Sequence, residues 1–160
     1  MIQVLNGPIE MALRVIALLD AYEDVPLSRE QLILLDHALI HSADYDGPPS
    51  LHPPLPARES ELSVKRSQVN AALQLLVRAG LADIQSRGPE VGVRAADGAR
   101  PFLQLLETPY ARRCGELARW TREVFGEASV IDLDRRIGLL AARSVPNRRD
   151  AENRDSTTED

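Results

Sequence analysis

The chain has 160 residues and 44% hydrophobic content, which is enough for one domain with a buried core and leaves little for a second. Its single cysteine, Cys114, excludes a disulfide framework or a thiolate zinc site within one chain and favours the reducing cytosol. The net charge of −5 argues against a general nucleic-acid coat. No apolar stretch suits a membrane span or an export signal, so we expect a cytoplasmic protein.

Two helices are predicted at the start of the chain. Pro8 suits the first turn of a helix over residues 9–22 that is apolar almost all round. Ser28 is a good N-cap for the second helix, and Gln31 is placed to complete a capping box. The core face of this second helix is predicted to consist of Leu32, Leu35, Ala38 and Leu39. Its remaining apolar residues exceed what one small core requires, so we expect some of them to face a partner: Ile33, Leu34 and Ile40.

Residues 42–57 contain five prolines and predict a long loop. Proline stiffens an extended segment and lowers the entropy cost of holding its shape. The loop therefore either presents Leu51, His52 and Leu55 to another protein or runs over the surface as a plain connector.

Residues 61–95 have the pattern of a helix-turn-helix followed by a β-hairpin. Residues 62–66 predict a short turn, and Ser67 is a suitable N-cap for the helix that follows. Residues 81–85 and 91–95 predict two strands joined by the turn-forming residues between them. This pattern is typical of a winged helix, a fold that reads DNA or docks on proteins and is rarely an enzyme.

The remaining elements are predicted to flank this unit. A short helix is expected over 101–106, a longer one from the cap at Thr108 to Gly126, and a last one over about 131–143. Residues 144–160 have few apolar side chains and are expected to be disordered. The fold class predicted is mainly α with a small β-hairpin, a winged helix-turn-helix with flanking helices in a single domain over residues 1–143.

The sequence offers no catalytic constellation, so we expect neither an enzyme nor a cofactor. His37 and His41 are four residues apart, as a metal pair on one helix face requires, and Asp44 or Asp46 could complete a site. The context lacks the glutamate and the third ligand of the zinc-protease pattern, and histidines at a helix end are usually ordinary hydrogen-bonding groups, so no metal is expected. Cys114 lies on the apolar helix face and is predicted to pack in the core.

Four segments together resemble the middle component of bacterial ABC-three-component systems, the class to which the Lamassu anti-phage systems belong. They are residues 6–10 (NGPIE), 34–45 (LLDHALIHSADY), 47–53 (GPPSLHP) and 107–111 (ETPYA). The resemblance spans about residues 6–126, and its most specific part is the block from His41 to Pro53. It implies a subunit without an active site that docks on an SMC-like coiled-coil ATPase, which holds an effector, often a nuclease, inactive until phage DNA is sensed.

Two functions therefore compete at this point: a protein-docking subunit of such a defence complex, and a winged-helix transcription regulator. For the first, the residues predicted to contact a partner are His41, Asp44, Gly47, Pro48, Pro49, Ser50, Leu51, His52 and Pro53. DNA contact is expected only as non-specific phosphate neutralisation within the complex, by Lys65, Arg66 and Arg87. No membrane or small-molecule substrate is expected.

Overall fold

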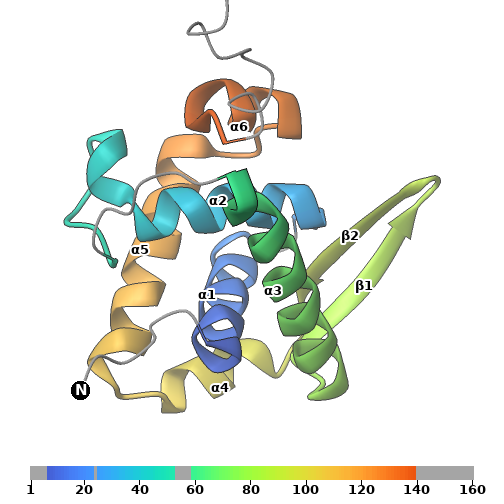
Figure 1. Ribbon diagram of the computed structural model, residues 1–160. Helices are drawn as coiled ribbons and strands as arrows, with labels where there is room; N and C mark the ends of the chain where they lie inside the picture. Colours follow the sequence, from blue (N-terminus) through green and yellow to red (C-terminus); the bar gives the residue numbers. More distant parts are fainter. Residues whose placement is uncertain (1–6, 24, 53–58, 140–160) are drawn as a thin grey trace, which may run out of the picture.

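The computed structural model describes residues 7–23, 25–52 and 59–139 (Figure 1). The described residues form a mainly helical fold with one antiparallel two-stranded hairpin, as the sequence predicts. In chain order the elements are α1 (Pro8–Ala21), α2 (Arg29–Ile40), the 3-10 helix η1 (Ser42–Tyr45), α3 (Glu59–Arg78), β1 (Ala82–Arg87), β2 (Glu90–Ala95), α4 (Ala99–Leu105), α5 (Pro109–Phe125) and α6 (Val130–Ile137).

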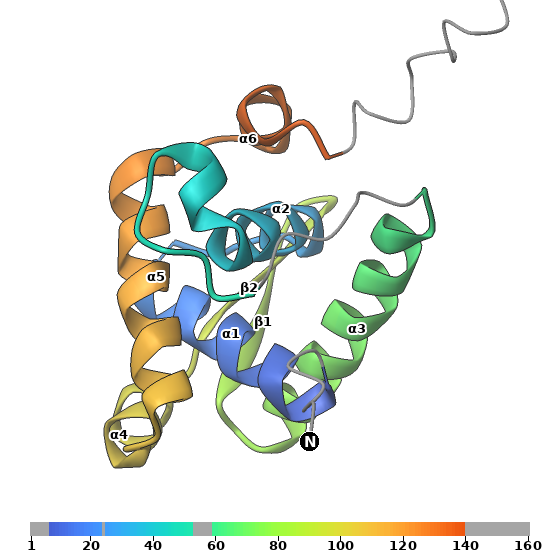
Figure 2. The ribbon, with the colours of Figure 1, turned by 60° about the vertical axis from the view of Figure 1, so that its left-hand side comes forward.

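Helix α1 lies at the centre of the fold. Pro8 occupies its first turn, as predicted, because a residue without an N–H loses no hydrogen bond there. The helix packs between α3 on one side and α5 on the other, and α2 crosses above it (Figures 1 and 2). Contact on several sides explains why its sequence is apolar almost all round: Met11, Val15, Ile16, Leu18 and Leu19 are all buried.

The start of α2 follows the predicted local chemistry. The Ser28 hydroxyl accepts a hydrogen bond from Gln31 N at 3.1 Å, and Ser28 N donates to Gln31 Oε1 at 2.9 Å. The expectation that surplus apolar residues of α2 face a partner is wrong. Helices α1, α3, α5 and α6 all pack on α2. They bury the surplus side chains Ile33, Leu34 and Ile40 within the chain itself.

Helix α3 is continuous from Glu59 to Arg78, so the predicted turn over residues 62–66 and the predicted N-cap at Ser67 are wrong. A single buried stripe runs along the whole helix, with a spacing of three and four residues: Leu62, Lys65, Val69, Ala72 and Leu76. Packing of this stripe outweighs the weak capping preference of one serine. Between α2 and α3 the described residues form η1 and the chain as far as His52.

The hairpin pairs Ala82 with Ala95 at its base and Arg87 with Glu90 at its tip. Only Gly88 and Pro89 form the turn, so both strands are longer than predicted, and Gly88 takes a positive φ of 62° that favours glycine. Leu27, between α1 and α2, forms a bridge to Val93 through two backbone hydrogen bonds of 2.8 Å. This order of helices, bridge and hairpin is compatible with a winged helix.

Helix α5 agrees with its predicted cap and end, whereas α4 begins two residues before the predicted start at Pro101 and α6 is shorter than predicted. Thr108 Oγ1 accepts from Ala111 N at 3.2 Å at the start of α5, and Gly126 ends that helix. Helix α6 ends at Gly138, in a left-handed conformation, before the predicted end at 143. The predicted disordered tail, 144–160, lies outside the described residues. None of the helices in the described ranges has the length and apolarity needed to cross a membrane.

Candidate functional site

Three buried charged side chains form an ion-paired cluster where α1, α2 and α3 meet. Asp36 of α2 is fully buried and accepts hydrogen bonds from Arg14 Nε at 2.6 Å and from Lys65 Nζ at 2.8 Å. Arg14 Nη1 also donates to the Tyr110 hydroxyl of α5 at 3.0 Å. The carboxylate therefore joins α1, α2 and α3, and Arg14 extends the cluster to α5.

Burial and nearby positive charge shift the pKa values of Asp36 and Tyr110 in opposite directions. Burial by itself would raise the pKa of Asp36, but the Lys65 ammonium and the Arg14 guanidinium together lower that pKa below its usual range. For Tyr110, burial raises the pKa to about 12, so the hydroxyl stays protonated. Each carboxylate oxygen of Asp36 accepts a hydrogen bond from a cationic side chain, so the cluster is suited to hold the helices together.

Three histidines lie around this cluster, and two of them have depressed pKa values. The His37 and His41 rings are 4.7 Å apart between centroids. Burial, reinforced by nearby positive charge, lowers the pKa of His37 to about 3 and that of His52 to about 4. Both rings are therefore neutral at neutral pH. Among residues 7–23, 25–52 and 59–139, no group of three His, Cys, Asp or Glu side chains is placed to hold a metal ion.

Because the pKa values of His37 and His52 are depressed in the folded state, we expect the protein to lose stability as the pH falls. The folded pKa values lie below the ordinary value of 6.5, so below pH 6.5 the unfolded chain binds more protons than the folded one. The free energy of unfolding begins to fall near pH 6.5 and continues to fall toward pH 4. Each histidine contributes no more than about 1.4 kcal/mol per pH unit, and less where solvent screens its ring.

Thermal denaturation between pH 7 and pH 4.5 measures this effect. The double variant H37N/H52N should show a flatter dependence of the melting temperature on pH than the wild type does. Equal slopes in the two proteins would assign the acid sensitivity to other groups.

The chain from His41 to His52 folds back over this cluster and is held by polar contacts. Ser42 Oγ donates to Pro48 O at 2.8 Å, and His52 N donates to Ile40 O at 3.2 Å. Arg113 Nη2 of α5 donates to Pro49 O at 2.6 Å. Residues 41–52 are therefore an anchored segment, in which proline carbonyls serve as acceptors.

The residues predicted to contact a partner differ in how far they are exposed. His41 and His52 are buried, at 6% and 8% exposure, so they anchor the segment and are not available to a partner. Asp44 and Pro49 are exposed. The others are partly buried, Gly47, Pro48, Ser50 and Leu51, and Pro53 lies outside the described residues.

The predicted phosphate contact of Lys65 does not fit the structure. Its side chain is only 3% exposed and its ammonium is bonded to Asp36, because Lys65 belongs to the buried stripe of α3. Arg66 is partly exposed and donates to Glu30 Oε2 at 3.2 Å, which offsets its charge. Arg87 is the last residue of β1, and its side chain lies outside the described part of the chain.

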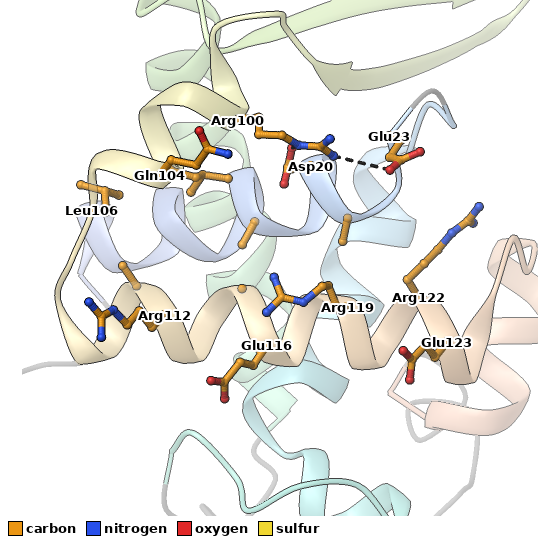
Figure 3. Close-up of a pocket in the computed structure, with 15 residues that line it drawn as sticks. Asp20, Glu23, Arg100, Gln104, Leu106, Arg112, Glu116, Arg119, Arg122 and Glu123 are labelled. Carbon is orange, nitrogen blue, oxygen red and sulfur yellow. Dashed lines mark hydrogen bonds and ion pairs between the residues drawn. The ribbon is translucent and has the colours of Figure 1, made fainter.

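An open groove of about 660 Å³ runs between α1, α4 and α5 (Figure 3). Small side chains line its floor, and Arg100 reaches from α4 to Asp20 and Glu23 at the end of α1. The lining contains four arginines and four acidic residues, so it offers no net charge to attract an anion. A second groove, of about 640 Å³ and more apolar, lies between α3 and the hairpin.

Sequence reasoning missed the buried cluster. It assigned no role to Arg14 or Asp36 and predicted a phosphate contact for Lys65. The usable signal was a charged residue within each of two strongly apolar helices, since buried charges are almost always paired. The prediction for Cys114 is confirmed: it is 1% exposed and packs in the core, and burial raises the pKa of its thiol to about 12.

The fold and the site define a small helical domain, compatible with a winged helix, in which a buried charged cluster joins the helices under an anchored proline-containing segment. The family model described as "ABC-three component (ABC-3C) system Middle Component 2" matches residues 4–145. The chain belongs to this family. It is therefore a component of an ABC-three-component system, which implies partner proteins. The comparison with curated proteins returned no match, and the comparison with solved structures returned none either.

Proposed function

We propose that this middle component is a non-catalytic accessory subunit that docks on the SMC-like coiled-coil ATPase of a Lamassu-type anti-phage defence system in the bacterial cytoplasm. In that complex it helps to hold or regulate an effector subunit, which we propose to be a nuclease. It needs no cofactor for this role.

The exposed face of α3 is the observation that carries the proposal. In a winged-helix regulator this helix enters the major groove of DNA and needs cations to neutralise phosphates. Over residues 62–78, whose side chains the structure describes, the exposed residues are mostly small, polar or apolar, and only one is cationic: Ser63, Val64, Ser67, Asn70, Ala71, Gln74, Leu75 and Arg78. Such a surface suits a protein partner better than a polyanion.

The anchored segment supports the same proposal. Its exposed residues include Asp44 and Asp46, which would repel phosphate and can bond to a basic protein surface. Contact of this segment with a partner stays a prediction, restricted to the residues that reach the surface.

We expect the full chain to co-purify with the tagged ATPase of its own system and to bind duplex DNA weakly at physiological salt. Any DNA affinity should be similar for random duplexes and for the upstream region of its own gene. The measurements are co-expression followed by affinity purification, and a fluorescence-anisotropy titration with both duplexes.

The alternative function, a winged-helix transcription regulator, makes the opposite prediction. Nanomolar binding restricted to the upstream region, without recovery of the ATPase, would replace the docking proposal with that alternative.

A further inference from the structure

The groove between α3 and the hairpin has one wall from each element. From α3, Asn70, Leu73, Gln74 and Val77 line it at helical spacing, so they form a single stripe along the helix. Leu73 and Val77 are partly buried against the core. The groove is therefore a continuation of the core toward the surface.

The opposite wall is an apolar hairpin face that the described part of the chain leaves bare. Ile84 pairs with Val93, and Val91 lies two residues before Val93, so the three side chains share one face of the hairpin. Val93 is buried, whereas its cross-strand partner Ile84 is 61% exposed and Val91, one pair nearer the tip on this face, is 56% exposed. The hairpin projects away from the helices (Figure 1). A two-stranded hairpin gains stability when such a face is covered.

The charged residues around this groove are predominantly positive. Two arginines line it, Arg29 and Arg78, and both are exposed. The one acidic lining residue, Glu30, forms ion pairs with Arg66 at 3.2 Å and with Arg29 at 3.5 Å, so the positive charge of the rim comes mainly from Arg78. An apolar ligand segment that carries acidic side chains would complement this rim.

A second copy of this chain offers no complementary ridge among its described residues. Its large exposed apolar side chains outside the groove lie singly on different elements, or eleven residues apart on α3: Ile9, Val64, Leu75, Leu105, Val124 and Ile131. A helix that fills a groove needs apolar residues at positions i, i+3, i+4 and i+7. The described residues therefore favour an occupant from another subunit.

Building on the proposed function, we infer that this groove binds an amphipathic helix of the SMC-like ATPase. The apolar ridge of that helix packs between Leu73 and Val77 on α3 and Ile84 and Val91 on the hairpin. Its flanking acidic residues face Arg29 and Arg78. The groove volume of about 640 Å³ is in the range that buries several side chains.

Co-purification of full-length variants with the tagged ATPase tests this assignment. V91E and I84E place a charge on exposed positions, so the fold should persist, and each should lower ATPase recovery at least tenfold. The matched control is I131E on α6, where Ile131 is 68% exposed and lies outside the groove; its recovery should equal that of the wild type. R78E should lower recovery several-fold and weaken its dependence on salt, whereas R112E on α5 should have no effect.

The outcomes separate the two proposals. If the wild type binds and V91E binds equally well, the ATPase docks elsewhere and only the groove assignment is wrong. If the wild type does not bind, both the proposed function and the groove assignment fall. Light scattering on the isolated chain adds a further check: a dimer that V91E dissociates would assign the groove to a second copy. Stronger ATPase binding after removal of residues 140–160 would mean that these residues of the same chain occupy the groove.

Discussion

Replacement of Asp36 by alanine is expected to lower the free energy of unfolding by about 3–5 kcal/mol. The carboxylate is fully buried and neutralises both Arg14 and Lys65, which lie at 2.6 and 2.8 Å. Its removal leaves two buried cations without their counter-ion, and their desolvation is no longer offset. Chemical denaturation monitored by circular dichroism measures the change.

Two further variants separate the charge effect from simple loss of packing. D20A removes the exposed pair between Asp20 and Arg100 and should cost less than about 1 kcal/mol. The triple variant R14M/D36L/K65M replaces the whole cluster with apolar side chains and should recover most of the stability lost in D36A. A D36A protein as stable as D20A would show that the cluster contributes no more than a surface pair.

Replacement of Gly47 by alanine is expected to cost about 1–3 kcal/mol and to disturb the anchored segment. A Cβ at this position would lie 2.5 Å from Trp120 Cε2 and 2.8 Å from Ser42 O. Relief requires either the indole or the backbone near Ser42 to move, which weakens the hydrogen bonds that hold residues 48–52. Trp120 is the only tryptophan in the chain, so its fluorescence reports the change directly.

G98A is the matched control for this variant. Gly98 has a negative φ of −77°, and a Cβ there meets no atom closer than 3.9 Å. We expect unchanged fluorescence and a change in unfolding free energy within about 0.5 kcal/mol. A G47A protein that matches G98A in both measurements would mean that the segment does not pack on Trp120 as described.

The anchored segment shows how far sequence reasoning reached. Its proline content correctly predicted an interruption between two helices, but the four residues after His41 form the 3-10 helix η1. The choice between a partner-binding loop and a connector depended on burial, which proline content does not determine. The structure shows that His41 and His52 face inward, so this part of the chain is an anchored surface.

The sequence by itself determined the features that depend on contacts within about four residues. The capping box of Ser28 and Gln31, Pro8 in the first turn of α1 and the cap at Thr108 are local interactions, so their residue types predict them. The hairpin also follows from two short β-prone runs with turn residues between them.

Only the tertiary structure decided which charged residues are buried and where α3 begins. Arg14 and Asp36 are 22 residues apart, and Asp36 and Lys65 are 29 apart, so no local pattern links them. The same packing that buries Lys65 makes α3 continuous through Ser67, because a long buried stripe contributes more stability than one N-cap. It also buries the surplus apolar residues of α2 under α6 and its neighbours, since core formation depends on elements that are distant in the sequence.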